Sequence, residues 1–63
     1  MKIERPLDFL DSQKGKTVLV YCKDKSHSGT LLAFDIHINL VIETPDTILF
    51  IRGDDVKSVE ELR

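Results

Sequence analysis

The chain has 63 residues, one cysteine and a formal net charge of −2 at pH 7, which predicts a single domain, residues 1–63, without an internal disulfide bond. The sequence has no Cys-x-x-Cys pair and no Cys/His set at zinc-like spacing, so we expect no metal and no cofactor. The slightly acidic balance excludes a protein that coats nucleic acid through general electrostatic attraction, and any nucleic-acid site must therefore be local.

The N-terminal segment favours a helix rather than a targeting signal. Its first ten residues, MKIERPLDFL, carry charges where a signal peptide has an apolar run, and no stretch of the chain is apolar enough to span a membrane. We therefore expect a cytoplasmic protein that does not bind membranes. Residues 4–14 are predicted to be helical, because Pro6 suits the first turn, Asp8 favours the positive end of the helix dipole and Gly15 can end the helix.

From residue 17 onward the chain favours strands that are separated by tight turns. The strand segments are rich in β-branched and aromatic residues, and the turns contain Gly, Pro, Asp and Ser. A short helix followed by about five closely spaced strands predicts a mostly β fold, a small and strongly bent antiparallel barrel over residues 17–59. The predicted strand segments are 17–22, 30–43, 48–52 and 56–59, with turns at 23–29, 44–47 and 53–55.

The segment ILFI, residues 48–51, is apolar at four consecutive positions, so both faces of this strand need to be covered. A barrel of this size buries only one face of a strand in its own core, and its core alone is marginal. The uncovered face would be an aggregation-prone edge unless another subunit pairs with it. The pattern predicts assembly by strand addition, although a small barrel that is stable alone and curls over both faces is the simpler alternative.

Residues 34–42, FDIHINLVI, alternate between apolar and polar side chains, so Asp35, His37 and Asn39 would share one face of an extended strand. The simplest interpretation is the polar outer face of a half-buried strand. The same residue types could bind a metal or act as acid–base catalysts, with Asp54 completing a metal-dependent nuclease, although no spacing demands this. A third interpretation is base recognition, because an asparagine amide can read a base edge while a histidine ring stacks.

The sequence Arg52-Gly53-Asp54 follows the next predicted strand. Alone it is a turn, in which glycine permits an unusual backbone conformation and aspartate bonds locally. An arginine held at a rigid turn also offers a guanidinium plane that stacks on bases and binds phosphate. The two segments together contain the parts of a single-strand nucleotide pocket, but periodicity does not place them side by side.

These segments resemble the paired motifs of the Sm and Sm-like (LSm) family, most closely its archaeal branch. The segment RPLDFL resembles the helix that precedes the barrel in this family. The resemblance covers nearly the whole chain and implies an N-terminal helix, a five-stranded bent barrel and a ring in which the fourth strand of one subunit pairs with the fifth strand of the next. The motifs read Gly29-x-Leu31-x-x-x-Asp35-x-His37-x-Asn39-Leu40 and Ile51-Arg52-Gly53-Asp54-x-Val56-x-x-Val59.

The resemblance also implies a uracil site in a loop. Asp35 would end one strand, His37 would lie in the loop and Leu40 would begin the next strand. A base would stack between an imidazole and a guanidinium, while an asparagine amide bonds its edge and is itself oriented by the aspartate of the second motif. The implied residues are His37, Asn39, Arg52, Gly53 and Asp54 for RNA binding, with Asp54 bonded to Asn39, and Asp35 for bracing the loop.

The motifs thus predict a homo-oligomeric ring, seven-fold rather than six-fold, that binds short U-rich single-stranded RNA at its pore. Family members are scaffolds in RNA processing and turnover and have no catalysis of their own. Two residues depart from the family pattern: Ile38 stands where Met is usual, and Asp55 stands where Asn is common and adds negative charge near the site. The alternative is therefore a structural or protein-binding ring with weak RNA affinity.

Overall fold

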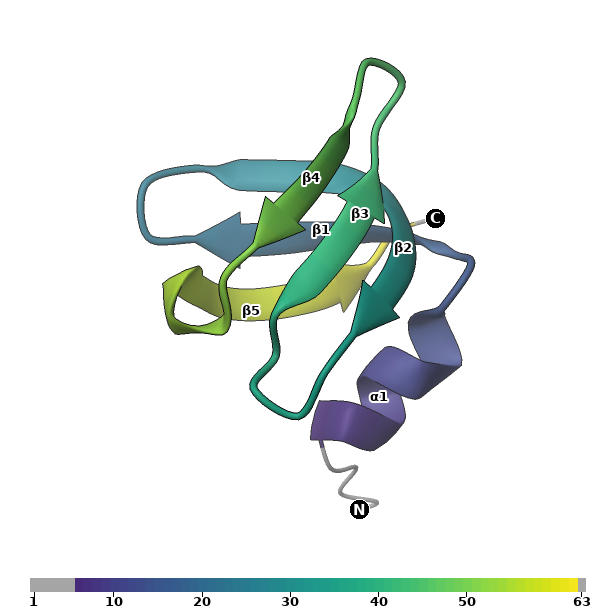
Figure 1. The fold of residues 1–63 in the computed structure, drawn as a ribbon, viewed down its shortest axis with the longest axis vertical. Helices are drawn as coiled ribbons and strands as arrows, with labels where there is room; N and C mark the ends of the chain where they lie inside the picture. Colours follow the sequence, from purple (N-terminus) through teal and green to yellow (C-terminus); the bar gives the residue numbers. More distant parts are fainter. Residues whose placement is uncertain (1–5, 63) are drawn as a thin grey trace.

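The computed structural model describes residues 6–62, which form one short α-helix, one 3-10 turn and five strands. The strands pair antiparallel throughout, in the order β4-β3-β2-β1-β5, and the sheet bends strongly (Figure 1). This arrangement confirms the predicted fold class. The elements are α1 (Pro6–Gln13), β1 (Thr17–Cys22), β2 (Ser26–Phe34), β3 (Leu40–Glu43), β4 (Ile48–Ile51), the 3-10 turn η1 (Gly53–Asp55) and β5 (Val56–Glu61).

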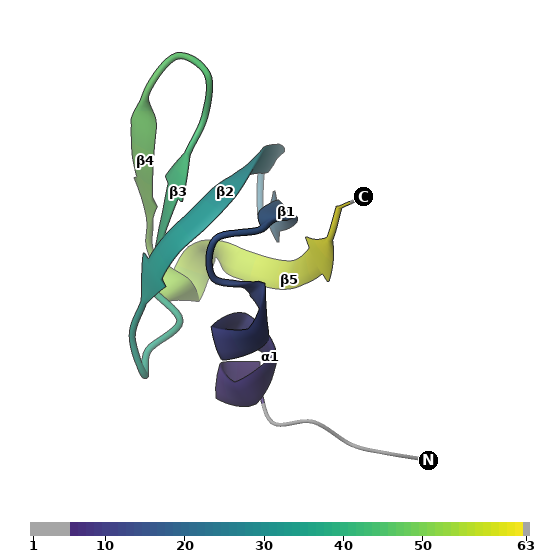
Figure 2. The ribbon, with the colours of Figure 1, turned by 90° about the vertical axis from the view of Figure 1, so that its right-hand side faces the viewer.

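Helix α1 packs against one end of the barrel, and the β3–β4 hairpin extends from the opposite end (Figure 2). Of the predicted helix 4–14, residues 4 and 5 lie outside the described residues, and the helix ends at Gln13. Gly15 accounts for this end, because its φ of 83° lies in the left-handed region and its N–H donates to the Leu31 carbonyl at 2.8 Å. At 8 residues α1 is too short to cross a membrane, and no other helix within residues 6–62 could do so.

Two predicted boundaries between strands are wrong. The turn predicted over 23–29 is shorter, because β2 already begins at Ser26 and His27 pairs with Val20 of β1. Pairing with a neighbouring strand outweighs the turn preference of these small polar residues. The long strand predicted over 30–43 is interrupted by a loop between Phe34 and Leu40, as the family resemblance implies.

The apolar strand β4 has one face in the barrel and one face outside it. Leu49 packs against the core and Ile51 is buried, whereas Ile48 and Phe50 point outward and are 60% and 67% exposed. Strand β4 lies at one edge of the sheet and β5 at the other, so each has one side without a strand partner within the described residues. The barrel therefore covers only half of the apolar run.

Strand β5 is longer than predicted. It begins at Val56, as predicted, and continues to Glu61, two residues beyond the predicted end. Cys22 pairs with Val56 while Tyr21 pairs with Ser58, so a bulge adds one residue to β5. The bulge explains why valines three positions apart both pack against the core.

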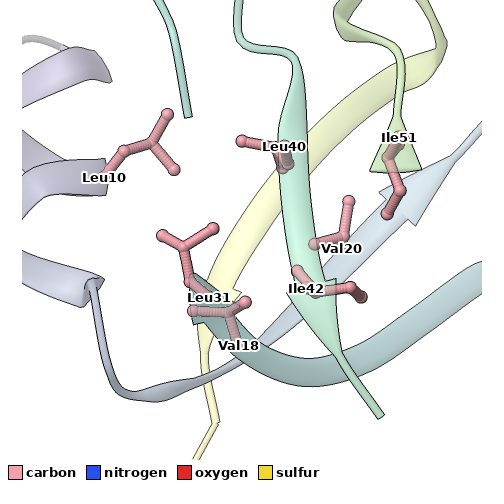
Figure 3. Close-up of a cluster of buried hydrophobic side chains, with 7 residues drawn as sticks. All are labelled: Leu10, Val18, Val20, Leu31, Leu40, Ile42 and Ile51. Atoms are coloured by element: carbon pink, nitrogen blue, oxygen red, sulfur yellow. The ribbon is translucent and has the colours of Figure 1, made fainter. Parts of the chain in front are cut away.

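The core is a cluster of seven aliphatic side chains from α1 and from strands β1 to β4 (Figure 3). Burial of each large apolar side chain contributes roughly 1.5–3 kcal/mol. Leu10 of the helix is one of these side chains, so α1 packs on the same core as Ile38 of the β2–β3 loop. The members are Leu10, Val18, Val20, Leu31, Leu40, Ile42 and Ile51.

Candidate functional site

The loop between β2 and β3 is folded around the carboxylate of Asp35. One oxygen, Oδ1, accepts hydrogen bonds from the backbone N–H groups of His37 at 2.8 Å and Asn39 at 3.1 Å. The other oxygen, Oδ2, accepts a hydrogen bond from the Asn39 side-chain amide at 3.0 Å. This last bond is the largest cause of a lowered pKa at Asp35, and the two backbone donors lower the pKa further. The carboxylate thus fixes both the loop backbone and the amide of Asn39.

The loop reverses direction at Ile38, which has a φ of 64°. The Ile38 N–H closes the turn by donating to the Asp35 carbonyl at 3.0 Å, and the Ile38 side chain packs against the core. A β-branched residue in the left-handed region is strained by about 1–2 kcal/mol. Ile38, which stands where Met is usual, therefore carries more backbone strain than Met would, since Met has no branch at Cβ. The apolar contact with the core also differs.

Gly53 brings the turn after β4 into contact with this loop. Its backbone N–H donates to Oδ1 of Asn39 at 2.7 Å, across 14 positions of sequence. A Cβ atom at Gly53 would overlap the carbonyl oxygen of His37 and would lie 3.1 Å from the carbonyl carbon of Ile38. Only glycine permits this close approach. It brings the two motifs side by side, which sequence periodicity could not predict.

Gly53→Ala is expected to destabilise the protein by about 3 kcal/mol or more, because the two loops must separate to accommodate the methyl group. Gly15→Ala is the control for backbone strain alone, about 1 kcal/mol, since Gly15 has a positive φ but open space around it. Thermal melting should show a clearly larger fall in melting temperature for Gly53→Ala than for Gly15→Ala. Equal melting temperatures of Gly53→Ala and the wild type would contradict the close approach.

Arg52 and Asp54 flank the glycine and form an ion pair at 3.5 Å, with side chains that are 77% and 70% exposed. The expected bond from Asp54 to Asn39 is not formed, because Asp35 holds that amide instead. An exposed ion pair of this kind is worth little, so the guanidinium remains available to other partners. The prediction that Asp54 of the second motif orients Asn39 is therefore wrong, because the bond comes from Asp35 of the first motif. The Asp-x-x-x-Asn spacing, which is typical of a local side-chain turn, could have indicated Asp35.

A shallow depression gathers the five side chains and backbone groups that the sequence assigned to binding. Asp35 does not line the depression, but its carboxylate is hydrogen-bonded to the Asn39 amide that does. Within residues 6–62, no group of three or more His, Cys, Asp or Glu side chains lies close enough together to hold a metal ion. The depression is open and combines two exposed planar side chains, His37 and Arg52, with the half-buried amide of Asn39. Its lining residues are His37, Asn39, Arg52, Gly53 and Asp54.

A family model described as the LSM domain matches residues 8–61. The chain belongs to the LSm family. This LSm chain is 34% identical over 68 positions to the snRNP Sm-like protein of Thermococcus sibiricus, and the alignment covers 89% of the chain and 90% of that relative. The predicted resemblance to archaeal Sm-like proteins is confirmed.

Two solved structures extend the comparison to the whole LSm fold. The Sm protein of Pyrococcus abyssii, solved in complex with a uridine heptamer, is 31% identical with a TM-score of 0.83, covering 94% of this chain and 100% of that one. A heptameric archaeal Sm protein is 27% identical with a TM-score of 0.80, covering 89% of this chain and 98% of that one.

Proposed function

We propose that residues 1–63 form one Sm-like domain that assembles into a homo-oligomeric ring and binds short U-rich single-stranded RNA at the pore. The observation that carries the proposal is the hydrogen bond between Gly53 and Asn39, which joins the two motifs in one depression. The complex of the Pyrococcus protein with a uridine heptamer supports uridine as the ligand. The heptameric archaeal relative supports seven subunits rather than six.

Each subunit offers a base two kinds of contact. The His37 ring and the Arg52 guanidinium are exposed planar groups that line the depression, suited to stack on the two faces of a base. In the same depression, Asn39 has one amide N–H and one Oδ1 lone pair left after its bonds to Asp35 and Gly53. This remaining pair matches the N3–H donor and O4 acceptor of uracil.

The two open edges of the sheet support the ring. Strand β4 of one copy can pair with β5 of the next, which would cover the outward side chains of Ile48 and Phe50. A closed ring also resolves the conflict between a net charge of −2 and a polyanionic ligand. It gathers one Arg52 from every subunit around a common pore, which makes the local potential positive.

We assign the ring a scaffold role in RNA processing or turnover, without a catalytic step and without a cofactor. The carboxylates that a nuclease would need are engaged otherwise, Asp35 with the loop and Asp54 with Arg52. We also propose a cytoplasmic location, in keeping with the unpaired Cys22, since free thiols are typical of reducing compartments.

Asn39→Ala tests the proposal directly. The substitution removes the edge contact, and the affinity for oligo-U should fall by about 1–3 kcal/mol per occupied site while the preference for oligo-U over oligo-C is lost. Fluorescence anisotropy with labelled oligo-U, oligo-C and oligo-A measures both effects, and sedimentation should show an unchanged assembly. A wild-type ring that binds none of these oligonucleotides would favour the alternative, a protein-binding ring whose RNA site is weakened by Asp55.

A further inference from the structure

A groove of about 390 Å³ lies between helix α1 and strand β5. Val56 and Val59, the residues of β5 that pack against the core, both line it, so the groove lies on the core side of the strand. An apolar cavity of about 150 Å³ already accepts benzene, so this groove has room for an aromatic side chain. Its lining is mainly apolar and includes Phe9, Leu10, Ile38, Gly53, Val56 and Val59.

The groove shares a wall with the depression that we assign to base binding. Gly53 lines both of them. Ile38 lines the groove, whereas its two neighbours in the chain, His37 and Asn39, line the depression. The positive φ of Ile38 persists only because the surrounding structure holds it. A side chain that fills the groove therefore supports the turn that places His37 and Asn39.

Strand addition between copies brings the outward face of β4 over the core side of β5. All pairings in the sheet are antiparallel, so β4 and β5 at its two edges run in the same direction. A second copy whose β5 pairs antiparallel with β4 is therefore turned over relative to the first copy, about an axis that crosses the strands in the plane of the sheet. Its core side then lies on the side to which β4 directs its outward side chains.

The same pairing determines which end of β4 meets which end of the groove. In an antiparallel pair, the C-terminal end of β4 lies beside the N-terminal end of β5, where Ile38, Gly53 and Val56 line the groove. Phe50 lies near the C-terminal end of β4, and Ile48 begins the strand. Both side chains are largely exposed in the isolated chain. The aromatic ring of Phe50 is thus directed to the end of the groove behind the base-binding loop.

We infer that Phe50 of each subunit fills this groove in the next subunit and packs behind Ile38, so that the neighbouring subunit completes each RNA site. The inference rests on the proposed function and adds a coupling between its two parts, assembly and RNA binding. Such a coupling is reciprocal: if the contact in the ring raises the affinity for RNA, bound RNA stabilises the ring by the same factor.

The test is Phe50→Leu, which keeps an apolar side chain on the outward face of β4 but leaves part of the groove unfilled. Sedimentation should show an intact ring, while the affinity for a uridine heptamer, measured by anisotropy, should fall by about fivefold or more. Ile48→Ala is the matched control, because it trims an outward side chain of the same strand at the end away from Ile38. Its assembled ring should bind the uridine heptamer as the wild type does.

The two variants separate this coupling from the strength of assembly in general. Equal losses of affinity in both would show that RNA binding follows the stability of the ring as a whole, and would overturn the role of Phe50. An unchanged affinity in Phe50→Leu would overturn the inference and leave the proposed function intact. A wild type that does not bind the uridine heptamer contradicts the proposed function itself.

A measurement on the wild type does not depend on the assembly of a variant. Uridine is uncharged and occupies one site at a time, so it neither bridges two subunits nor changes the charge of the pore. It can favour the ring over free subunits only if assembled subunits bind it more tightly. The protein concentration at which the ring dissociates on dilution should therefore fall severalfold with saturating uridine, and less with cytidine. An unchanged concentration with uridine would overturn the inference.

Discussion

Replacing Phe50 with glutamate is expected to break the ring into monomers that keep their fold. The Phe50 side chain is 67% exposed on an edge strand, so the isolated chain should tolerate a charged glutamate at this position. In the ring the same position would be covered by the next subunit. Burial of the phenylalanine contributes roughly 1.5–3 kcal/mol per interface, and a buried unpaired charge costs more. Analytical ultracentrifugation at micromolar concentration should show a single slow species, while the far-UV circular dichroism remains that of the wild type.

Leu49→Lys is the control from the opposite face of the same strand. Leu49 packs against the core, so a lysine there should lower the stability of the chain itself and weaken the circular dichroism signal. The pair of variants separates loss of assembly from loss of folding. A Phe50→Glu protein that sediments with the wild type would show that the outward face of β4 is not an interface.

The second large effect is expected for Arg52→Ala. Every subunit loses its guanidinium at once, and a U-rich strand that occupies several sites loses stacking of about 1–3 kcal/mol at each. With two or more occupied sites, the affinity for a uridine heptamer should fall on the order of 100-fold or more. The plot of log affinity against log salt concentration should also become shallower, because fewer phosphates are neutralised. Anisotropy titrations at two salt concentrations measure both quantities.

Lys14→Ala provides the comparison, because it removes an exposed positive charge at the end of α1, outside the depression. It should weaken binding only slightly. If Arg52 instead served only to shape the turn before η1, Arg52→Ala would lower the melting temperature and leave the dissociation constant for oligo-U unchanged. That result would contradict a role for Arg52 in stacking on bases.

The fold was largely predictable because its boundaries have local physical causes. Gly15 ends the helix through its backbone conformation, and the β-branched segments form strands. Periodicity failed in the loop 35–39, where Ile36 and Ile38 continue the apolar alternation. Ile36 is in fact 74% exposed and Ile38 has a positive φ. The hydrogen bonds of the Asp35 carboxylate override the strand pattern there, and only the family motif indicated this loop.

The membership of the candidate site was predicted from the motifs, but its internal bonds were not. Residues 14 positions apart meet because Gly53 has no side chain, a contact that no local pattern encodes. The resemblance assigned Asp54 as the partner of Asn39 and gave Asp35 only the bracing of the loop. The structure has Asp35 in that position because the turn at Ile38 folds the loop back on itself.

Native mass spectrometry of the wild-type protein with a uridine heptamer tests the central claim most directly. We expect a single closed assembly of seven 7.2 kDa chains that retains the uridine heptamer, whereas a cytidine heptamer should be retained far less. Free 7.2 kDa chains at micromolar concentration, or a ring that retains neither oligonucleotide, would contradict it.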